Sequence, residues 1–181
     1  MSTLFREARP APPGVHLMWT WAQSAVIWAL ALAVGPYALT RLEAALGVPS
    51  FAFDHQLAVG LAILVVASVL NLASGRAMAL RGDGTPLPTA CARRLVVAGP
   101  YAYLRNPMAV FGLAQGVGVA VALGSWLVLA YVAAGGVLWH LAIRPAEEAD
   151  LEGRFGEPYR AYRRHVRCWI PRATPWVPGN A

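Results

Sequence analysis

The chain has 181 residues, of which 57% are hydrophobic and 13% are charged, and its formal net charge is +6. This composition is too apolar for an ordinary soluble domain and predicts an integral membrane protein. Two cysteines are too few for a disulfide framework or an all-cysteine metal site, so we expect no bound metal.

Four apolar stretches reach or approach the roughly 20 residues that a helix needs to cross the hydrocarbon core. They are residues 17–39, 57–75, 107–123 and 125–143. Because only LGSW separates the last two, we expect them to form a tight antiparallel helical hairpin. The sequence therefore predicts an all-α, polytopic membrane helical bundle of about four spans, which forms a single membrane domain over residues 1–181.

Polar and small residues interrupt these apolar stretches. Asn71 and Gln115 should face the bundle interior, where they either bridge helices or contact a ligand. Four glycines offer close contact between helices through the absence of a side chain: Gly112, Gly116, Gly135 and Gly136.

The distribution of arginines predicts the orientation of the bundle. Five lie between Arg76 and Arg105 and seven lie from Arg144 onward, whereas the 40–56 loop has only Arg41. By the positive-inside rule, both termini, the loop 81–106 and the tail 144–181 should therefore be cytoplasmic. All basic residues are arginine, which is typical of a GC-rich genome, and we expect a multi-pass protein of a bacterial inner membrane.

The tail after the fourth apolar stretch should be helical. Pro145 suits the first turn of a helix, while Gly153 and Gly156 should break it, and Pro158 can begin another. In that second helix Tyr159, Tyr162, Val166 and Trp169 recur at helical spacing, with arginines at the other positions. This pattern predicts a cytoplasmic helix that either lies on anionic headgroups or packs back on the bundle.

A polar line marks the end of the fourth apolar stretch. His140, Arg144, Glu147 or Glu148, and Leu151 are three or four residues apart, so on a continuous helix they share one face where the bilayer gives way to water. Two interpretations remain open at this point. The line is a helix-end ion pair beside an interfacial histidine, or it is part of a polar cytoplasmic site.

Two sequence blocks carry a family resemblance. GPYAYLRNPMAVFG at residues 99–112 is followed, beyond the predicted hairpin, by EEADL and then FGEPYRAYRRHVRCWIPR. Together they resemble the membrane methyltransferases related to isoprenylcysteine carboxyl methyltransferase and the phospholipid N-methyltransferases. The shared pattern is G-x-Y-x-x-x-R-[HN]-P-x-Y-x-x-G, a hairpin, and then E-E-x-x-L-x-x-x-F-G-x-x-Y-x-x-Y, which covers about residues 90–172 here.

The resemblance implies a bundle without a Rossmann domain that binds S-adenosylmethionine at the cytoplasmic helix ends and releases S-adenosylhomocysteine. By position, the cofactor-binding residues would be Tyr101, Asn106, Pro107, Met108, Ala109 and Glu147, together with Arg93, Arg94, Leu95 and Val96. Asn106 and Ala109 stand where many relatives have His and Tyr. Arg144 lies one position from the substrate-contacting arginine of the isoprenylcysteine enzymes.

For the reaction, methyl transfer to a lipidic or small acceptor follows from the resemblance, and the acceptor group stays open between a carboxylate and an amine or thiol. Arg144 would orient a carboxylate, whereas Glu148 or His140 would take the proton from an amine or thiol. These three are the predicted catalytic residues. The expected partners are membrane lipids and the acceptor.

Other functions remain as alternatives. A catalytically degenerate relative or a purely structural bundle would keep the fold without the reaction. A haem carrier would need paired axial histidines, and only His140 lies near a span on the cytoplasmic side. The arginines are explained by topology and headgroups, so we expect no nucleic-acid partner. The oligomeric state is left open.

Overall fold

The computed structural model describes residues 6–85 and 90–179, so part of the predicted 81–106 loop lies outside the described residues. Within those ranges the regular structure is all helical, with one isolated bridge between Glu7 and Cys91 and no strand. The predicted all-α bundle is therefore confirmed, and no Rossmann fold occurs in the part of the chain that is described.

The first span is one long helix made of three segments. It comprises α1 (Pro13–Trp28), the π-helical η1 (Ala29–Val34) and α2 (Gly35–Leu46). It is longer than the predicted 17–39 because its ends are not set by hydropathy. Pro13 supplies a favourable first helical position, and Gly47 ends the helix in the left-handed region with φ +66°.

The remaining helices follow the predicted order. After α3 (Gln56–Gly82) the short 3-10 helix η3 (Gly99–Ala102) leads to α4 (Pro107–Leu123). A turn at Gly124 and Ser125 then makes the predicted hairpin with α5 (Trp126–Leu138), where the Ser125 hydroxyl accepts a hydrogen bond from the Val128 amide at 3.1 Å. Helix α5 continues without a break through π-helical η4 (Trp139–Ile143) into α6 (Arg144–Phe155), and α7 (Glu157–His165) follows.

Three of these continuous helices are long and apolar enough to cross a membrane. They are Pro13–Leu46, Gln56–Gly82 and Trp126–Phe155, and α4 is a shorter apolar helix of 17 residues. The apolar part of the last one ends at Ile143, because α6 carries six charged side chains in its sequence RPAEEADLEGRF. We therefore treat α6 as lying beyond the membrane-spanning segment.

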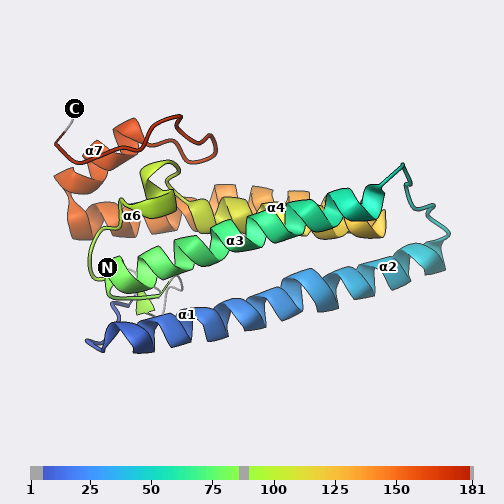
Figure 1. Cartoon of the computed structure of the whole chain (residues 1–181), viewed down its shortest axis with the longest axis horizontal. Coiled ribbons are helices and arrows are strands. Elements are labelled where there is room, and N and C mark those ends of the chain that lie inside the picture. Colours follow the sequence, from blue (N-terminus) through green and yellow to red (C-terminus); the bar gives the residue numbers. More distant parts are fainter. Residues whose placement is uncertain (1–5, 86–89, 180–181) are drawn as a thin grey trace.

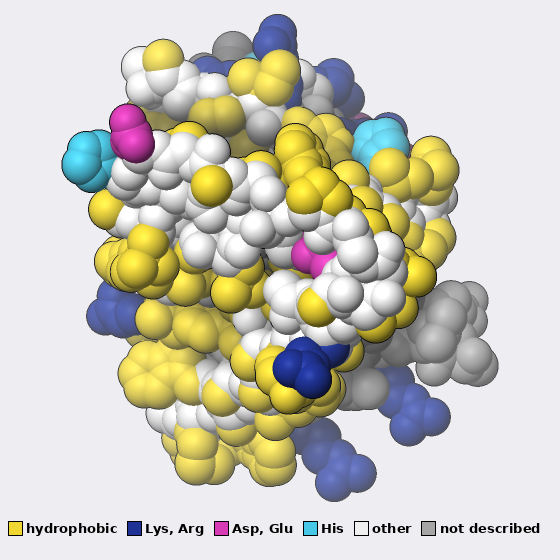
Figure 2. Space-filling view, turned by 90° about the vertical axis from the view of Figure 1, so that its right-hand side faces the viewer, with side chains coloured by type: hydrophobic (Ala, Val, Ile, Leu, Met, Phe, Trp, Pro, Cys, Tyr) yellow, Lys and Arg dark blue, Asp and Glu magenta, His cyan; other side chains and the backbone are white. Residues whose placement is uncertain are grey.

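The two ends of the helix bundle are built from different elements (Figure 1). The first helix lies along one flank of α3, and α6 and α7 gather at the end where α1 begins and α3 ends. At the opposite end, the buried carboxylate of Glu43 on α2 accepts a hydrogen bond from the Leu127 amide at 2.8 Å, which caps α5 from a neighbouring helix. Figure 2 looks onto this end and shows mostly hydrophobic and uncharged surface.

Close packing and polar contacts join α3 to α4. A Cβ on Gly118 would lie 2.8 Å from the Leu64 amide nitrogen and 2.9 Å from the Gly60 carbonyl oxygen, so glycine is required there. Asn71 and Gln115 are buried in the interior, as predicted, and the Gln115 amide donates to the Ser68 hydroxyl at 2.9 Å.

Only part of the predicted glycine contacts is observed. Gly116 packs closely on Val132, and Gly136 approaches Leu113, but a Cβ on Gly135 would meet nothing within 4 Å. A Cβ on Gly112 would be in ordinary contact with the Asn71 amide of α3, at 3.7 Å. Gly135 alone of the four leaves open space instead of bringing helices together.

The tail packs back on the bundle. Tyr159, Tyr162, Val166 and Trp176 form a buried cluster, so the apolar stripe of α7 does not face lipid. Trp169 lies beyond the helix, which ends at His165. The predicted break at Gly153 was wrong, since that residue lies within α6, and Gly156 alone breaks the helix with φ +58°.

Candidate functional site

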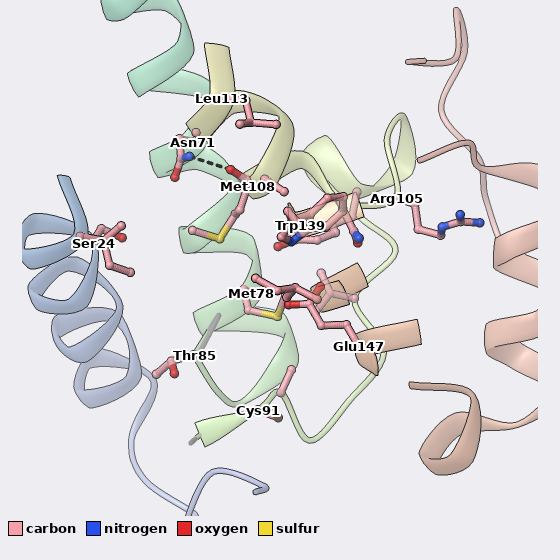
Figure 3. A pocket seen from close by; sticks show the side chains of 18 of the residues that line it. Ser24, Asn71, Met78, Thr85, Cys91, Arg105, Met108, Leu113, Trp139 and Glu147 are labelled. Carbon is pink, nitrogen blue, oxygen red and sulfur yellow. Dashed lines mark hydrogen bonds between the residues drawn. The ribbon is translucent and has the colours of Figure 1, made fainter. Parts of the chain in front are cut away.

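A cavity of about 780 Å³ opens among the first helix (α1 to α2), α3, α4, the continuous helix from α5 to α6 and the 91–106 loop. Its size is within the range of small-molecule sites. Figure 3 shows Glu147 and Trp139 on one side of it and Ser24 of α1 on the opposite side. Most of the lining is apolar, and the charged groups lie at the end near α6, so the cavity has a polar part and an apolar part.

Glu147 is the central charged group of the polar part. It projects from α6 into the cavity, and its carboxylate has no hydrogen bond or ion pair with any described residue. Burial and, to a smaller extent, the neighbouring Glu148 carboxylate raise the pKa of this carboxyl to about 7. Near neutral pH this group is therefore poised between its charged and neutral forms.

The 99–112 segment forms the facing wall. Tyr101 is buried in η3, and its carbonyl accepts a hydrogen bond from the Tyr162 hydroxyl at 2.7 Å. Burial, with a smaller effect of Glu147, keeps the pKa of the Tyr101 phenol well above its usual value, so the phenol stays neutral. This neutral ring at the cavity wall offers a polarisable face and a hydroxyl donor.

Asn106 occupies the position before α4 but does not cap it. Asparagine at this position usually accepts a hydrogen bond from the first turn of the helix. Here the side chain makes no such bond, and its buried Nδ2 has no partner among the described residues. Because Asn106 also lines the cavity, its amide is available to a ligand.

The predicted cofactor residues fall into two groups. Eight of the ten line the cavity: Tyr101, Asn106, Met108, Ala109, Glu147, Arg94, Leu95 and Val96. Pro107 and Arg93 do not. Pro107 is buried at the start of α4, and the Arg93 amide donates to the Gly82 carbonyl at 2.6 Å. Arg94 turns its guanidinium outward to Asp83.

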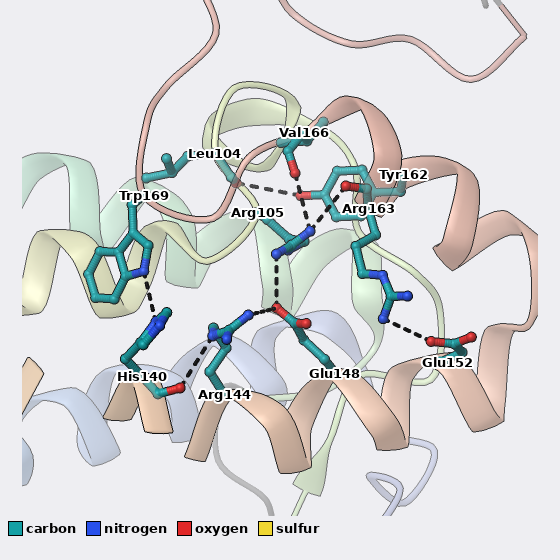
Figure 4. A network of polar contacts seen from close by, with 10 residues as sticks. All are labelled: Leu104, Arg105, His140, Arg144, Glu148, Glu152, Tyr162, Arg163, Val166 and Trp169. Carbon is teal, nitrogen blue, oxygen red and sulfur yellow. Dashed lines mark hydrogen bonds and ion pairs between the residues drawn. The ribbon is translucent and has the colours of Figure 1, made fainter. Parts of the chain in front are cut away.

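The predicted catalytic residues His140, Arg144 and Glu148 lie outside the cavity lining and form a separate polar network (Figure 4). Glu148 pairs through Oε1 with Arg105 at 3.0 Å and with Arg144 at 3.1 Å. The Arg144 Nε donates to the His140 carbonyl at 3.4 Å. Consecutive residues on a helix point about 100° apart, and of this pair only Glu147 lines the cavity.

The Arg105–Glu148 pair joins the 99–112 segment to α6. Both side chains are nearly buried, and the Arg105 guanidinium also donates to the Arg163 carbonyl at 3.1 Å. The pair therefore holds Asn106, the next residue in the chain, and Glu147, the neighbour of Glu148, at fixed positions across the polar part of the cavity.

Like the Arg105–Glu148 pair, a second ion pair braces the site, that is, it fixes a loop of the cavity wall to α6, and sequence reasoning missed it. Asp150 and Arg154 both line the cavity and pair at 2.7 Å, and Arg154 also donates to the Ala92 carbonyl at 2.6 Å. This contact fixes the 91–96 loop to α6. The i, i+4 spacing of an acid and an arginine was the available signal. No cluster of three or more metal-ligating side chains occurs among the described residues.

The apolar part of the cavity lies between the two π-helical segments. Leu32 of η1 and Trp139 of η4 line it, as do Tyr131 and Gly135 of α5. π-Helical insertions are frequent at functional sites because they shift the side chains that follow. Beside this part, the Asn71 amide donates to the Met108 carbonyl at 3.0 Å, which helps to fix the first turn of α4.

Comparison with known proteins adds one finding. The model of a family described as phospholipid methyltransferase matches residues 55–158, which is more than half of the chain. This range contains α3, the 99–112 segment, the hairpin and α6. A search of curated protein sequences found no significant match.

Proposed function

The chain belongs to the phospholipid methyltransferase family, and from this premise we propose that it transfers a methyl group from S-adenosylmethionine to a lipidic or small acceptor at the cytoplasmic membrane interface. Family membership and the long apolar helices make it an integral membrane methyltransferase. The cofactor, the acceptor and the orientation are the parts that we propose.

The observation that carries the cofactor proposal is the unpartnered carboxylate of Glu147 opposite the unpartnered amide of Asn106 in one cavity. A carboxylate accepts hydrogen bonds from an amino group or from ribose hydroxyls, and an asparagine amide donates to a carboxylate or a ring nitrogen. The face of Tyr101 favours a nearby cation. These residues fit S-adenosylmethionine, which supplies an electrophilic methyl group on a sulfonium sulfur.

The residues of this chain align the reacting groups and exclude water from them. The apolar walls shield the reacting atoms, and the braces through Arg105 and Arg154 fix the polar groups that orient them. Glu148 and His140 lie outside the cavity lining. The arrangement therefore favours an acceptor that needs no base from these residues, such as a carboxylate or an amine that enters in its neutral form.

A lateral opening supports a lipidic acceptor. Ile27 of α1, Leu138 of α5 and Ile143 of η4 line the cavity and stay accessible, with exposed fractions of 44%, 61% and 42%. Apolar side chains that face both the cavity and the surface of a membrane helix mark a path for a hydrocarbon chain between lipid and site.

The orientation proposal rests on the charged end of the bundle. Arg105, Asp150 and Arg154 lie at this end beside the polar part of the cavity. A water-soluble cofactor would enter here, which by the arginine distribution is the cytoplasmic side of a bacterial inner membrane.

Calorimetric titration of S-adenosylmethionine and S-adenosylhomocysteine into the detergent-purified chain tests the cofactor. We expect Glu147→Gln to weaken binding at least tenfold and the control Glu152→Gln, on the same helix but outside the cavity, to leave it unchanged. Absence of binding to the folded, unmodified chain would overturn the proposal.

Incorporation of labelled methyl groups tests the acceptor. Nanodiscs that contain phosphatidylethanolamine are compared with free ethanolamine, and faster labelling of the lipid is expected. Cofactor binding without transfer to any lipid or small acceptor would favour the catalytically degenerate bundle.

A further inference from the structure

A second, smaller cavity lies in the tail, apart from the one described above. It has a volume of about 390 Å³, and eight residues between Arg164 and Thr174 line it. Four of its lining side chains are basic: Arg164, His165, Arg167 and Arg172. The segment that follows α7, residues 166–174, supplies most of this cavity and is called the basic loop.

The positive charge of the tail is available in the basic loop and not on α7. On the helix, Arg160, Arg163 and Arg164 are all engaged by Glu152 or Glu157, at distances from 2.7 Å to 3.6 Å. In contrast, the exposed guanidinium of Arg167 has no hydrogen bond or ion pair with any residue in the described ranges. Arg167 and Arg172, whose positive charges no described carboxylate compensates, would together attract an anion.

Arg172 is held in place while part of its guanidinium stays free. Its Nη1 donates to the His165 carbonyl at 2.6 Å and its Nε to the Thr174 carbonyl at 3.2 Å. Its Nη2 has no acceptor among the described residues. A guanidinium that is fixed through two groups and open through the third is preorganised for an anion such as a phosphate.

The basic loop lies at the membrane boundary. The ring of Trp169 packs edge-on against Trp139 with centroids 5.4 Å apart, and its Nε1 donates to His140 Nδ1 at 3.0 Å (Figure 4). Both partners belong to η4, the last part of the apolar span, where Leu141 is 70% exposed. Trp169 and Ile170 are themselves exposed, at 37% and 57%.

We propose that the basic loop binds the headgroup phosphate of an anionic phospholipid of the surrounding membrane. Arg167 and Arg172 would contact the phosphate, and Trp169 and Ile170 would lie between the headgroup and the first part of the acyl chains. Tryptophan prefers this depth, and arginine beside it pairs with anionic headgroups. A soluble anion would need the basic groups but would leave the two exposed apolar side chains without a role.

This lipid site is connected to the catalytic cavity through the backbone. The Arg105 amide donates to the Arg167 carbonyl at 3.0 Å, and the Arg172 amide donates to the Tyr103 carbonyl at 2.9 Å. A headgroup on the basic loop therefore also stabilises the segment that carries Tyr101 and Asn106.

Native mass spectrometry of the detergent-purified full chain tests the site without any measurement of activity. Dioctanoyl phosphatidylglycerol, dioctanoyl phosphatidylcholine and sodium phosphate are the probes, and thermal unfolding first establishes that each variant is folded. The unmodified chain should retain phosphatidylglycerol in preference to phosphatidylcholine. Arg167→Gln and Arg172→Gln should each weaken this binding on the order of fivefold, since an arginine near an anionic surface contributes about 1 kcal/mol.

Arg41→Gln provides the matched control, because it removes one exposed arginine at the opposite end of the bundle. It should leave phosphatidylglycerol binding unchanged. Equal retention of phosphatidylglycerol by all variants would overturn the proposal. Displacement of the lipid by millimolar phosphate would also overturn it, because the site would then be one for soluble anions.

Discussion

At the scale of single residues, two adjacent glutamates on α6 have different environments. Glu148 is compensated by two arginines, at 3.0 Å and 3.1 Å. Glu147 has no partner among the described residues and lies in the cavity. A buried carboxylate without a counterion costs folding free energy, and such a cost is typical of a group that is kept for a ligand.

The raised pKa of Glu147 predicts a pH-dependent stability. Its folded-state pKa of about 7 lies above the ordinary 4.5, so the folded protein binds a proton more tightly than the unfolded chain does. The resulting stabilisation is complete below pH 4.5 and is lost as the pH rises through 7. At pH 8, Glu147→Gln should therefore be more stable than the unmodified chain by about 1–3 kcal/mol. Thermal unfolding in detergent between pH 5 and 8 measures this difference, and a constant difference across that range would contradict it.

The same titration predicts a pH dependence of ligand binding. If the ionised carboxylate of Glu147 accepts hydrogen bonds from the cofactor, the affinity must fall as that carboxylate becomes protonated below pH 7. We expect S-adenosylhomocysteine to bind about tenfold more weakly at pH 6 than at pH 8. Calorimetry at the two pH values provides the measurement. In Glu147→Gln the residual affinity should not change over this interval, and an unchanged profile of the unmodified chain would argue against contact with Glu147.

At the scale of secondary structure elements, α6 and the 99–112 segment depend on each other through Arg105 and Glu148. Glu148→Gln would leave two arginines facing a neutral amide in a nearly buried site, so we expect a loss of about 3 kcal/mol in the free energy of unfolding. Cofactor affinity should fall several-fold as well, although Glu148 does not line the cavity. Chemical denaturation and calorimetry measure the two effects.

Glu152→Gln is the control for that prediction. It removes a carboxylate from the same helix, but the partners of Glu152 are the more exposed Arg160 and Arg163, so the cost should be below about 1 kcal/mol. If Glu148→Gln kept full stability and cofactor binding but lost methyl transfer, Glu148 would be a catalytic residue, as the sequence analysis predicts, and the bracing role would be wrong.

Hydropathy could predict that four apolar helices exist, but it could not predict where they end. The first helix ends at Gly47 because that glycine has a left-handed conformation. The helix that begins with α5 continues past Ile143, because its helical hydrogen bonding persists into α6. The same limit applies at the site. Spacing alone placed His140, Arg144, Glu147 and Glu148 together, and only the rotation of the helix, set by its packing, separates the cavity residue Glu147 from the other three.

At the scale of the whole molecule, one cavity joins a polar part beside α6 to an apolar part among the long apolar helices. The motif residues from the 99–112 segment and α6 could be placed by resemblance to a known family. The wall formed by the first helix could not, since Ser24, Trp28 and Leu32 line the cavity but lie outside the matched residues 55–158. Long-range contacts of this kind follow from tertiary packing and leave no local pattern in the sequence.

The division of the cavity predicts that its two parts can be changed separately. Gly135 lines the apolar part, and a Cβ there would meet nothing within 4 Å, so Gly135→Leu should fill that part without forcing the helices apart. Binding of S-adenosylhomocysteine should persist within about twofold, whereas methylation of a long-chain lipid acceptor should fall at least tenfold.

Gly153→Leu is the matched control, because Gly153 is also free of close neighbours but lies on α6 away from the cavity lining. Loss of cofactor binding in Gly135→Leu would show that the cofactor extends into the apolar part. Full activity toward the long-chain acceptor would show that the hydrocarbon chain takes another path.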